Sequence, residues 1–141
     1  MVVVLDACAL IALLRREPGH SIVAEKVVAS DIALIHAVNW CEVRYDFLRR
    51  EGGERLAEEA LADIRELGIE IYELMDEPLW RLVSELKARS FSQKTRIALA
   101  DCFALTLAKL TEGQLLTADH EMAPFTDFCS VHFFRNPGTF L

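Results

Sequence analysis

This sequence lacks the features that define several protein classes. No apolar run approaches the ~20 residues that span a bilayer, and the apolar start is broken at Asp6 with no basic segment before it. We therefore expect neither a membrane helix nor a signal peptide, and a cytoplasmic location. The four cysteines form no C-x-x-C pair and are predicted to be small buried hydrophobic side chains. A Gly-rich phosphate loop, an internal repeat and a low-complexity linker are also missing.

Length and composition are those of a globular protein with a substantial core. The chain has 141 residues, of which 52% are hydrophobic, and this predicts one domain over residues 1–141. The net charge of −7 argues against a protein that holds nucleic acid by overall electrostatic attraction. It leaves room for an enzyme that meets RNA through a local basic rim and metal ions, or for a chain that docks a basic protein partner.

Short apolar runs alternate with amphipathic segments along the whole chain. The strands are predicted at residues 2–5, 32–35, 69–72, 115–117 and 131–135. The helices are predicted at residues 7–14, 20–29, 37–50, 54–67, 77–88 and 97–110. This alternation predicts a three-layer α/β/α fold with a central, mostly parallel sheet of four to five strands.

Acidic residues stand in apolar surroundings at several of these elements. Asp6 ends the first strand, and Asp119 follows the fourth. Glu42 and Asp101 lie within apolar helices, and the positions three and four residues from Asp101 hold only Ala, Ile and Leu. A salt bridge along the helix therefore cannot explain Asp101, which either faces solvent or points into a cleft. Asp6 has a simpler alternative role as the N-cap of the next helix.

These acids can converge, because the carboxyl ends of parallel strands meet at one edge of a sheet. Carboxylates that lie close together raise one another's pKa unless a cation separates them. Hard divalent cations bind carboxylate oxygens, so the set predicts a site for Mg²⁺ or Mn²⁺. Metal-assisted hydrolysis of a phosphodiester is the natural chemistry of such a site. Asn39, one helical turn before Glu42, either orients that carboxylate or caps its helix.

The residues around these acids resemble the motifs of the PIN-domain ribonucleases. The similarity is greatest to the toxin member of VapBC-type toxin–antitoxin pairs. The matching segments, in order and at family-like spacing, are VVVLDACALIALLRREPG at the start, NWCEV at 39–43, ALADCFALTLAK at 98–109 and LLTADHEM at 115–122. The resemblance covers nearly the whole chain.

The resemblance assigns roles residue by residue. It places Asp6, Glu42, Asp101 and Asp119 in the catalytic, metal-binding acidic cluster. Thr117 matches a hydroxyl residue that would hold a carboxylate or a metal-bound water. Relatives often carry Ser or Thr just after the first Asp and Gly before the third acid. This chain has Ala7, Cys8 and Ala100 there, so a thiol or nothing replaces the hydroxyl.

The resemblance also implies an activity and partners. It implies endonucleolytic RNA cleavage, in which water attacks the phosphorus in line and leaves 5′-phosphate and 3′-hydroxyl ends. It further implies a homodimer and a neutralising antitoxin. Large apolar side chains on charged helices either belong to the core or form the surface for such a partner: Tyr45, Phe47, Leu48 and Trp80. The alternative function is a non-catalytic PIN-like module that binds RNA or protein partners.

A basic segment before the Asp101 helix is the predicted RNA contact. Residues 87–96 are interpreted as a loop with no acid and one aromatic residue. The candidate RNA-binding residues are Lys87, Arg89, Phe91, Lys94 and Arg96. An ordinary solvated surface loop is the alternative. If the loop fails, the next candidates are Arg15, Arg16, Arg49 and Arg50.

Overall fold

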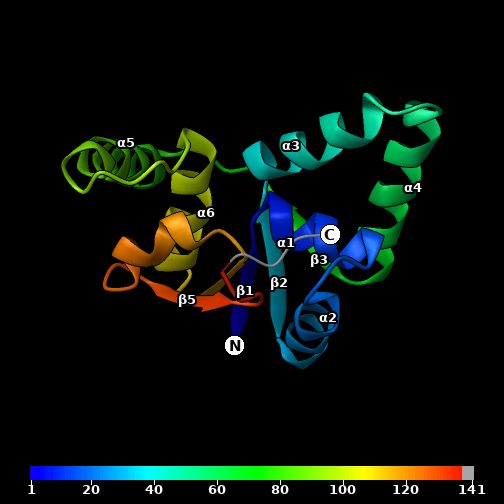
Figure 1. Ribbon diagram of the computed structural model, residues 1–141, viewed down its shortest axis with the longest axis horizontal. Coiled ribbons are helices and arrows are strands. Elements are labelled where there is room, and N and C mark those ends of the chain that lie inside the picture. Colours follow the sequence, from blue (N-terminus) through cyan, green and yellow to red (C-terminus); the bar gives the residue numbers. More distant parts are fainter. Residues whose placement is uncertain (138–141) are drawn as a thin grey trace.

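The computed structural model describes residues 1–137 and shows a central sheet with helices on both faces (Figure 1). The strands are β1 (Val2–Leu5), β2 (Ile32–His36), β3 (Ile69–Tyr72), β4 (Gln114–Thr117) and β5 (Ser130–Phe133). The helices are α1 (Ala7–Arg15), α2 (His20–Ala29), α3 (Ala37–Leu48), α4 (Gly53–Glu66), α5 (Glu77–Ser92), α6 (Leu99–Leu110) and the 3₁₀-helix η1 (His120–Phe125). Up to Pro137, no helix is long and apolar enough to cross a membrane.

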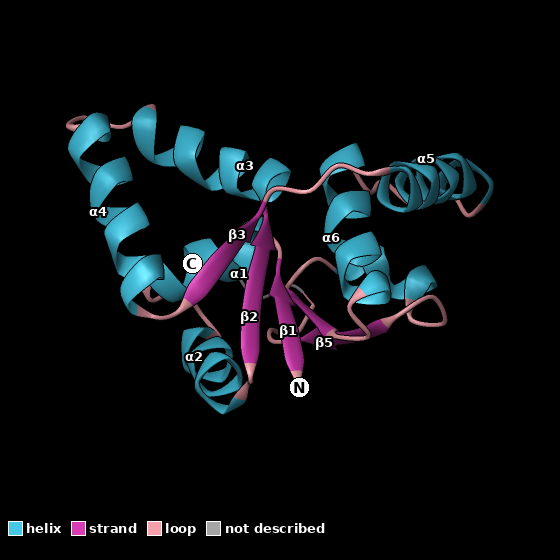
Figure 2. Ribbon diagram, turned by 180° about the vertical axis from the view of Figure 1, so that it is seen from behind, coloured by secondary structure: helices cyan, strands magenta, loops and turns pink. Residues whose placement is uncertain are grey.

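The sheet has five strands in the order β3-β2-β1-β4-β5, and every pairing is parallel (Figure 2). β1 lies in the centre because its unbroken apolar run can be buried on both faces. β3 and β5 lie at the edges. The predicted three-layer α/β/α fold is confirmed, and the sheet is parallel throughout. Residues 138–141 of the predicted domain lie outside the described residues.

Alternation along the strands divides the interior into two cores. In β1, Val3 and Leu5 pack with α1 to α4, whereas Val4 packs with α5, α6 and η1. β2 divides in the same way, with Ile35 on the first face and Leu34 on the second. The layers of helices on the two faces are visible in Figure 1. Successive strand residues point to opposite faces, so one short strand serves both cores.

One helix is longer than the sequence predicted. α5 runs to Ser92, whereas its helical pattern predicted an end near residue 88, so residues 87–92 are helix and not loop. Ser90 is buried in register with Leu86, and its hydroxyl donates to the Lys87 carbonyl at 2.6 Å. Ser90 thus continues the buried face of α5. A search for apolar residues at helical spacing overlooks this residue because serine is polar. The other predicted elements begin and end within two residues of their predicted bounds.

Gly19 allows the turn into α2 to pack against the last part of the described chain. Its φ is +88°, and a Cβ atom built there would lie 2.4 Å from the carbonyl oxygen of Phe134. We expect Gly19→Ala to lower the free energy of unfolding by about 1–2 kcal/mol for the left-handed conformation and by a further ~1–3 kcal/mol for the clash. Urea unfolding followed by circular dichroism measures this loss.

Gly52 provides the matched control for this substitution. Its φ is +69°, and nothing lies within 4 Å of the corresponding Cβ position. Gly52→Ala should therefore lose only the conformational part, about 1–2 kcal/mol. Equal losses in the two variants would show that the contact with Phe134 has no energetic weight.

Candidate functional site

All four predicted acids lie toward the carboxyl edge of the sheet. Asp6 directly follows β1, and Asp119 follows β4, its parallel neighbour. Glu42 is in the second turn of α3, which begins where β2 ends. Asp101 is in the first turn of α6, which packs against α3 and β1. The parallel order of β2, β1 and β4 therefore brings the starts of these segments to one edge.

Asp6 is almost completely buried, with 3% of its surface exposed. It N-caps α1 by accepting from the Ala9 amide at 2.8 Å, so the simple capping role predicted for it is real. It also accepts hydrogen bonds from the Cys8 thiol, at 3.0 Å, and from the Thr117 hydroxyl. Burial raises the pKa of Asp6 to about 6, although these three donors lower it and the Asp119 charge raises it further. Cys8 thus occupies the place expected for a hydroxyl donor.

Thr117 links the two strand-end acids through its hydroxyl group. It is fully buried, donates to Asp6 and accepts from the Asp119 amide at 3.0 Å. We expect Thr117→Val to lower the free energy of unfolding by about 1–3 kcal/mol, because the Asp119 amide and one Asp6 oxygen lose their partner. Thr117→Ser keeps the hydroxyl and should lose only about 1 kcal/mol for the missing methyl. Chemical denaturation of both variants tests this order, and an equally stable Val variant contradicts it.

Asn39 orients Glu42 and ties α3 to α6. Its side-chain nitrogen donates to Glu42 Oε1 at 3.4 Å and to the carbonyl of Ala100, next to Asp101, at 3.0 Å. Burial raises the pKa of Glu42, and the Asn39 hydrogen bond opposes this. The alternative role of Asn39 as a helix cap is wrong, because the His36 ring caps α3 by accepting from the Val38 amide.

The capping histidine was missed in the sequence. A histidine stands at the end of an apolar strand immediately before a helix, and this position was its only signal. His36 is 1% exposed, and its second ring nitrogen lies 3.2 Å from the Leu74 carbonyl. Nδ1 must be the acceptor in the cap, so Nε2 carries the proton and donates to Leu74. Burial accordingly lowers the pKa of His36.

Asp101 lies in the first turn of α6 and not in the middle of a helix, because α6 begins at residue 99. Its carboxylate accepts from the Ala98 amide at 2.7 Å. Burial raises its pKa to about 7; the Ala98 hydrogen bond opposes this, and the charges of Asp6, Asp119 and Glu42 each add to it. Burial is thus the main reason why the ionised form of Asp101 is disfavoured, and the other three acids add to it.

The chemistry of the four carboxylates fits a hard divalent cation, but the described side chains do not converge on one point. Among residues 1–137, no group of three or more His, Cys, Asp or Glu side chains lies close enough to share an ion. Asp6, Asp101 and Asp119 instead accept backbone amides, the last from Glu121. A carboxylate has about four lone-pair sites, so one that accepts a backbone amide can still bind a cation. Asp6, Glu42, Asp101 and Asp119 therefore remain the predicted ligands.

The basic segment is less free than its sequence suggested. Lys87 donates to the Ile97 carbonyl at 2.8 Å, and Arg89 pairs with Asp127 at 3.0 Å. Both residues belong to α5, so they lie on a helix instead of the predicted loop. Asp127, which pairs with Arg89, comes after η1 in the chain. The sequence of residues 87–96 contains no acid and therefore gave no sign of this partner.

The rest of the segment lies beside the Asp119 side of the site. The Thr95 hydroxyl and the Arg96 amide both donate to Glu121, in the 3₁₀-helix that follows Asp119. Phe91, Lys94 and Arg96 are exposed. Their exposure is compatible with the predicted contact to RNA, and this role stays a prediction.

The chain was compared with models of known protein families, and one family matches most of it. The chain matches the PIN domain over residues 3–126, which include all four acids. It therefore belongs to the PIN-domain family. A comparison with curated proteins found no match.

Solved structures share the fold across nearly the full length. The VapBC complex of Salmonella typhimurium, solved bound to DNA, is 14% identical and covers 96% of this chain and 99% of its own, with a TM-score of 0.74. VapBC2 of Rickettsia felis, bound to a promoter DNA fragment, is 16% identical, with coverages of 94% and 98% and a TM-score of 0.73. FitAcB of Neisseria gonorrhoeae is 18% identical, with coverages of 95% and 99% and a TM-score of 0.70. At these identities the likeness concerns the fold.

Proposed function

We propose that this chain is a cytoplasmic, metal-dependent endoribonuclease and the toxin of a type II toxin–antitoxin pair. The observation that carries the proposal is the placement of Asp6, Glu42, Asp101 and Asp119 toward the carboxyl edge of one parallel sheet. A protein without catalytic use for these acids would gain stability by replacing one of them, since lone buried carboxylates are costly. Membership of the PIN-domain family and the likeness to VapBC and FitAcB complexes support the same function.

The four acids would hold Mg²⁺ or Mn²⁺ through carboxylate oxygens. A divalent cation there supplies Lewis-acid stabilisation of charge on the phosphate and lowers the pKa of bound water. The chain's own residues prepare this site. Thr117 and Cys8 orient the Asp6 carboxylate, and Asn39 orients Glu42. These hydrogen bonds fix the orientation of the Asp6 and Glu42 carboxylates.

The proposed partners are RNA, an antitoxin and a second copy of the chain. RNA would lie across the carboxyl edge of the sheet, with Phe91, Lys94 and Arg96 on its η1 side. Of the apolar side chains predicted for a partner, Phe47 belongs to the core and Leu48 is half-buried. Tyr45 and Trp80 are 59% and 46% exposed on separate helices, so they keep that role.

Incubation of the purified chain with RNA tests the proposal. We expect internal cleavage with Mg²⁺ or Mn²⁺, none with EDTA, and products with 5′-phosphate and 3′-hydroxyl ends. Asp6→Asn should lose cleavage and stay folded, because Asn also caps helices well. Metal-dependent cleavage that survives Asp6→Asn, or RNA binding with no cleavage by the unmodified chain, would favour the non-catalytic PIN-like module.

A further inference from the structure

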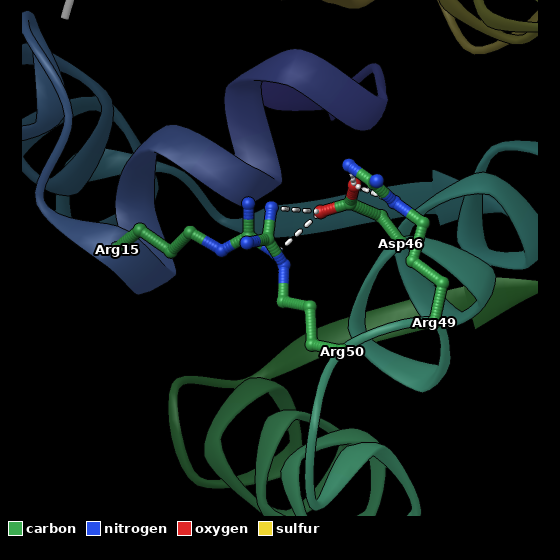
Figure 3. A network of polar contacts seen from close by, with 4 residues as sticks. All are labelled: Arg15, Asp46, Arg49 and Arg50. Atoms are coloured by element: carbon green, nitrogen blue, oxygen red, sulfur yellow. Dashed lines mark hydrogen bonds and ion pairs between the residues drawn. The ribbon is translucent and has the colours of Figure 1, made fainter.

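Three arginine side chains converge on a single aspartate where α1 and α3 end. Asp46 of α3 accepts from Arg15, which comes from the end of α1 (Figure 3). Arg49 donates to the same carboxylate through Nε and Nη2 at 3.0 and 2.8 Å, and Arg50 Nη2 lies 3.5 Å from it. We call these four residues the arginine cluster.

The arginine cluster has more positive charge than its acid can neutralise. The other ion-paired arginines in residues 1–137 each have an acid of their own: Arg55 with Glu59, Arg81 with Glu77, Arg89 with Asp127 and Arg135 with Glu17. In the cluster, three guanidinium groups share one carboxylate and leave two positive charges unmatched. In a chain with a net charge of −7, this is a local attraction for an anion.

The arginine cluster is also ordered and accessible. The Arg15 guanidinium lies over the Phe47 ring, 4.6 Å from its centroid, and its side chain is 22% exposed. The side chains of Arg49 and Arg50 are 63% and 43% exposed. Asp46 thus holds two exposed guanidinium groups in place while solvent still reaches them. A guanidinium fixed in this way loses less side-chain entropy when it binds an anion, and its planar fork matches phosphate.

The position of the arginine cluster links it to the four acids. α1 and α3 both start at the carboxyl edge of the sheet, next to Asp6 and Glu42, and the Arg15–Asp46 contact joins their far ends. Asp46 follows Glu42 by four residues and lies on the same face of α3, and Arg49, seven residues after Glu42, is the C-cap of the helix. Two helical turns separate Glu42 from Arg49, roughly 10 Å along the axis.

We propose that Arg49 and Arg50, held by Asp46, bind phosphates of the RNA strand that passes the four acids. This inference rests on the proposed nuclease function and adds a contact on the α1–α3 side of the site. Two exposed guanidinium groups with unmatched charge can each bind a phosphate, whereas an arginine that is fully paired with its own acid cannot. The overall negative charge of the protein repels RNA. A local excess of positive charge on the arginine cluster would attract RNA to the neighbourhood of the four acids.

The test compares RNA binding by Arg49→Gln/Arg50→Gln with binding by a matched control, both in an Asp101→Asn background that prevents cleavage. The control is Arg65→Gln/Lys109→Gln. It removes the same charge from exposed residues that also lie at helix ends, but at the amino edge of the sheet. Titration of single-stranded RNA at several salt concentrations gives affinity and salt slope.

We expect the cluster variant to bind RNA roughly tenfold more weakly at low salt. Its salt slope should fall by about 1.4, since each phosphate contact on a single strand contributes about 0.7. The control should change neither quantity by a comparable amount. Thermal melting checks the fold of both proteins. Arg49→Gln alone, which keeps Arg50, should show about half of the effect.

Several outcomes would overturn the inference. Equal affinities and slopes in the cluster and control variants would reduce the arginine cluster to a helix-end stabiliser. Unchanged RNA binding with loss of a co-expressed acidic partner would assign the surface to a protein instead. The nuclease proposal is judged separately, by metal-dependent cleavage in the unmodified chain. Either failure is therefore recognisable without the other, and a chain that binds no RNA at all fails both.

Discussion

Asp101→Asn should reduce RNA cleavage on the order of 10²–10³-fold or more, and leave a protein that is at least as stable as the unmodified chain in metal-free buffer at pH 8. Metal stabilisation of charge in phosphodiester hydrolysis is worth several kcal/mol, which corresponds to a rate loss on the order of 10²–10³-fold when a ligand is removed. The gain in stability follows because burial, and in addition the charges of Asp6, Asp119 and Glu42, raise the pKa of Asp101 and so oppose its ionised form. A neutral amide removes this repulsion, and its oxygen can still accept from the Ala98 amide.

Cleavage rates and thermal unfolding, measured on the same samples, separate the two effects. Asp63→Asn is the control, since Asp63 is exposed on α4 and its substitution removes the same charge elsewhere. It should retain full activity and gain no stability. An Asp101→Asn protein that cleaves RNA as fast as the unmodified chain would remove Asp101 from the metal ligands, and a strongly destabilised one would show that its capping role outweighs the repulsion.

Metal should stabilise the protein more strongly at high pH than at low pH. Burial raises the folded-state pKa of Asp6 to about 6 and of Asp101 to about 7, each from an ordinary value of 3.8. The folded protein therefore binds these protons more tightly than the unfolded chain does. This stability is fully present below pH 3.8 and is lost as the pH rises through 6 and 7. A divalent cation restores it by pairing with the ionised acids.

Thermal melting between pH 5.5 and 8, with EDTA or with Mn²⁺, measures this linkage. We expect saturating Mn²⁺ to raise the melting temperature by about 5 °C or more at pH 8 and by much less at pH 5.5. His36 acts in the opposite direction, because burial lowers its pKa and its cap on α3 weakens as it is protonated in acid. Comparison with Asp101→Asn at each pH cancels this contribution. A stabilisation by Mn²⁺ that is independent of pH would contradict the linkage.

Most of the fold and the candidate acids followed from local pattern. The apolar run Val2–Leu5 can be satisfied only by burial on both faces, and this placed β1 at the centre of a parallel sheet. The common direction of the strands then placed Asp6 and Asp119 at one edge without knowledge of any contact. Ser90 marks the limit of this method, because a buried polar residue extended α5 beyond its apolar pattern.

The polar partners of the site were decided only by tertiary structure. Thr117 lies 111 residues from Asp6 in the chain, and Asn39 lies 61 residues from the Ala100 carbonyl that it holds. The sequence offered one basic segment as the RNA contact, yet folding pairs Arg89 with Asp127, 38 residues away. The spacing of buried residues is a property of each helix or strand and can be recognised from its own sequence. Charge neutralisation and hydrogen bonding depend on which elements pack together, so they exist only once the chain has folded.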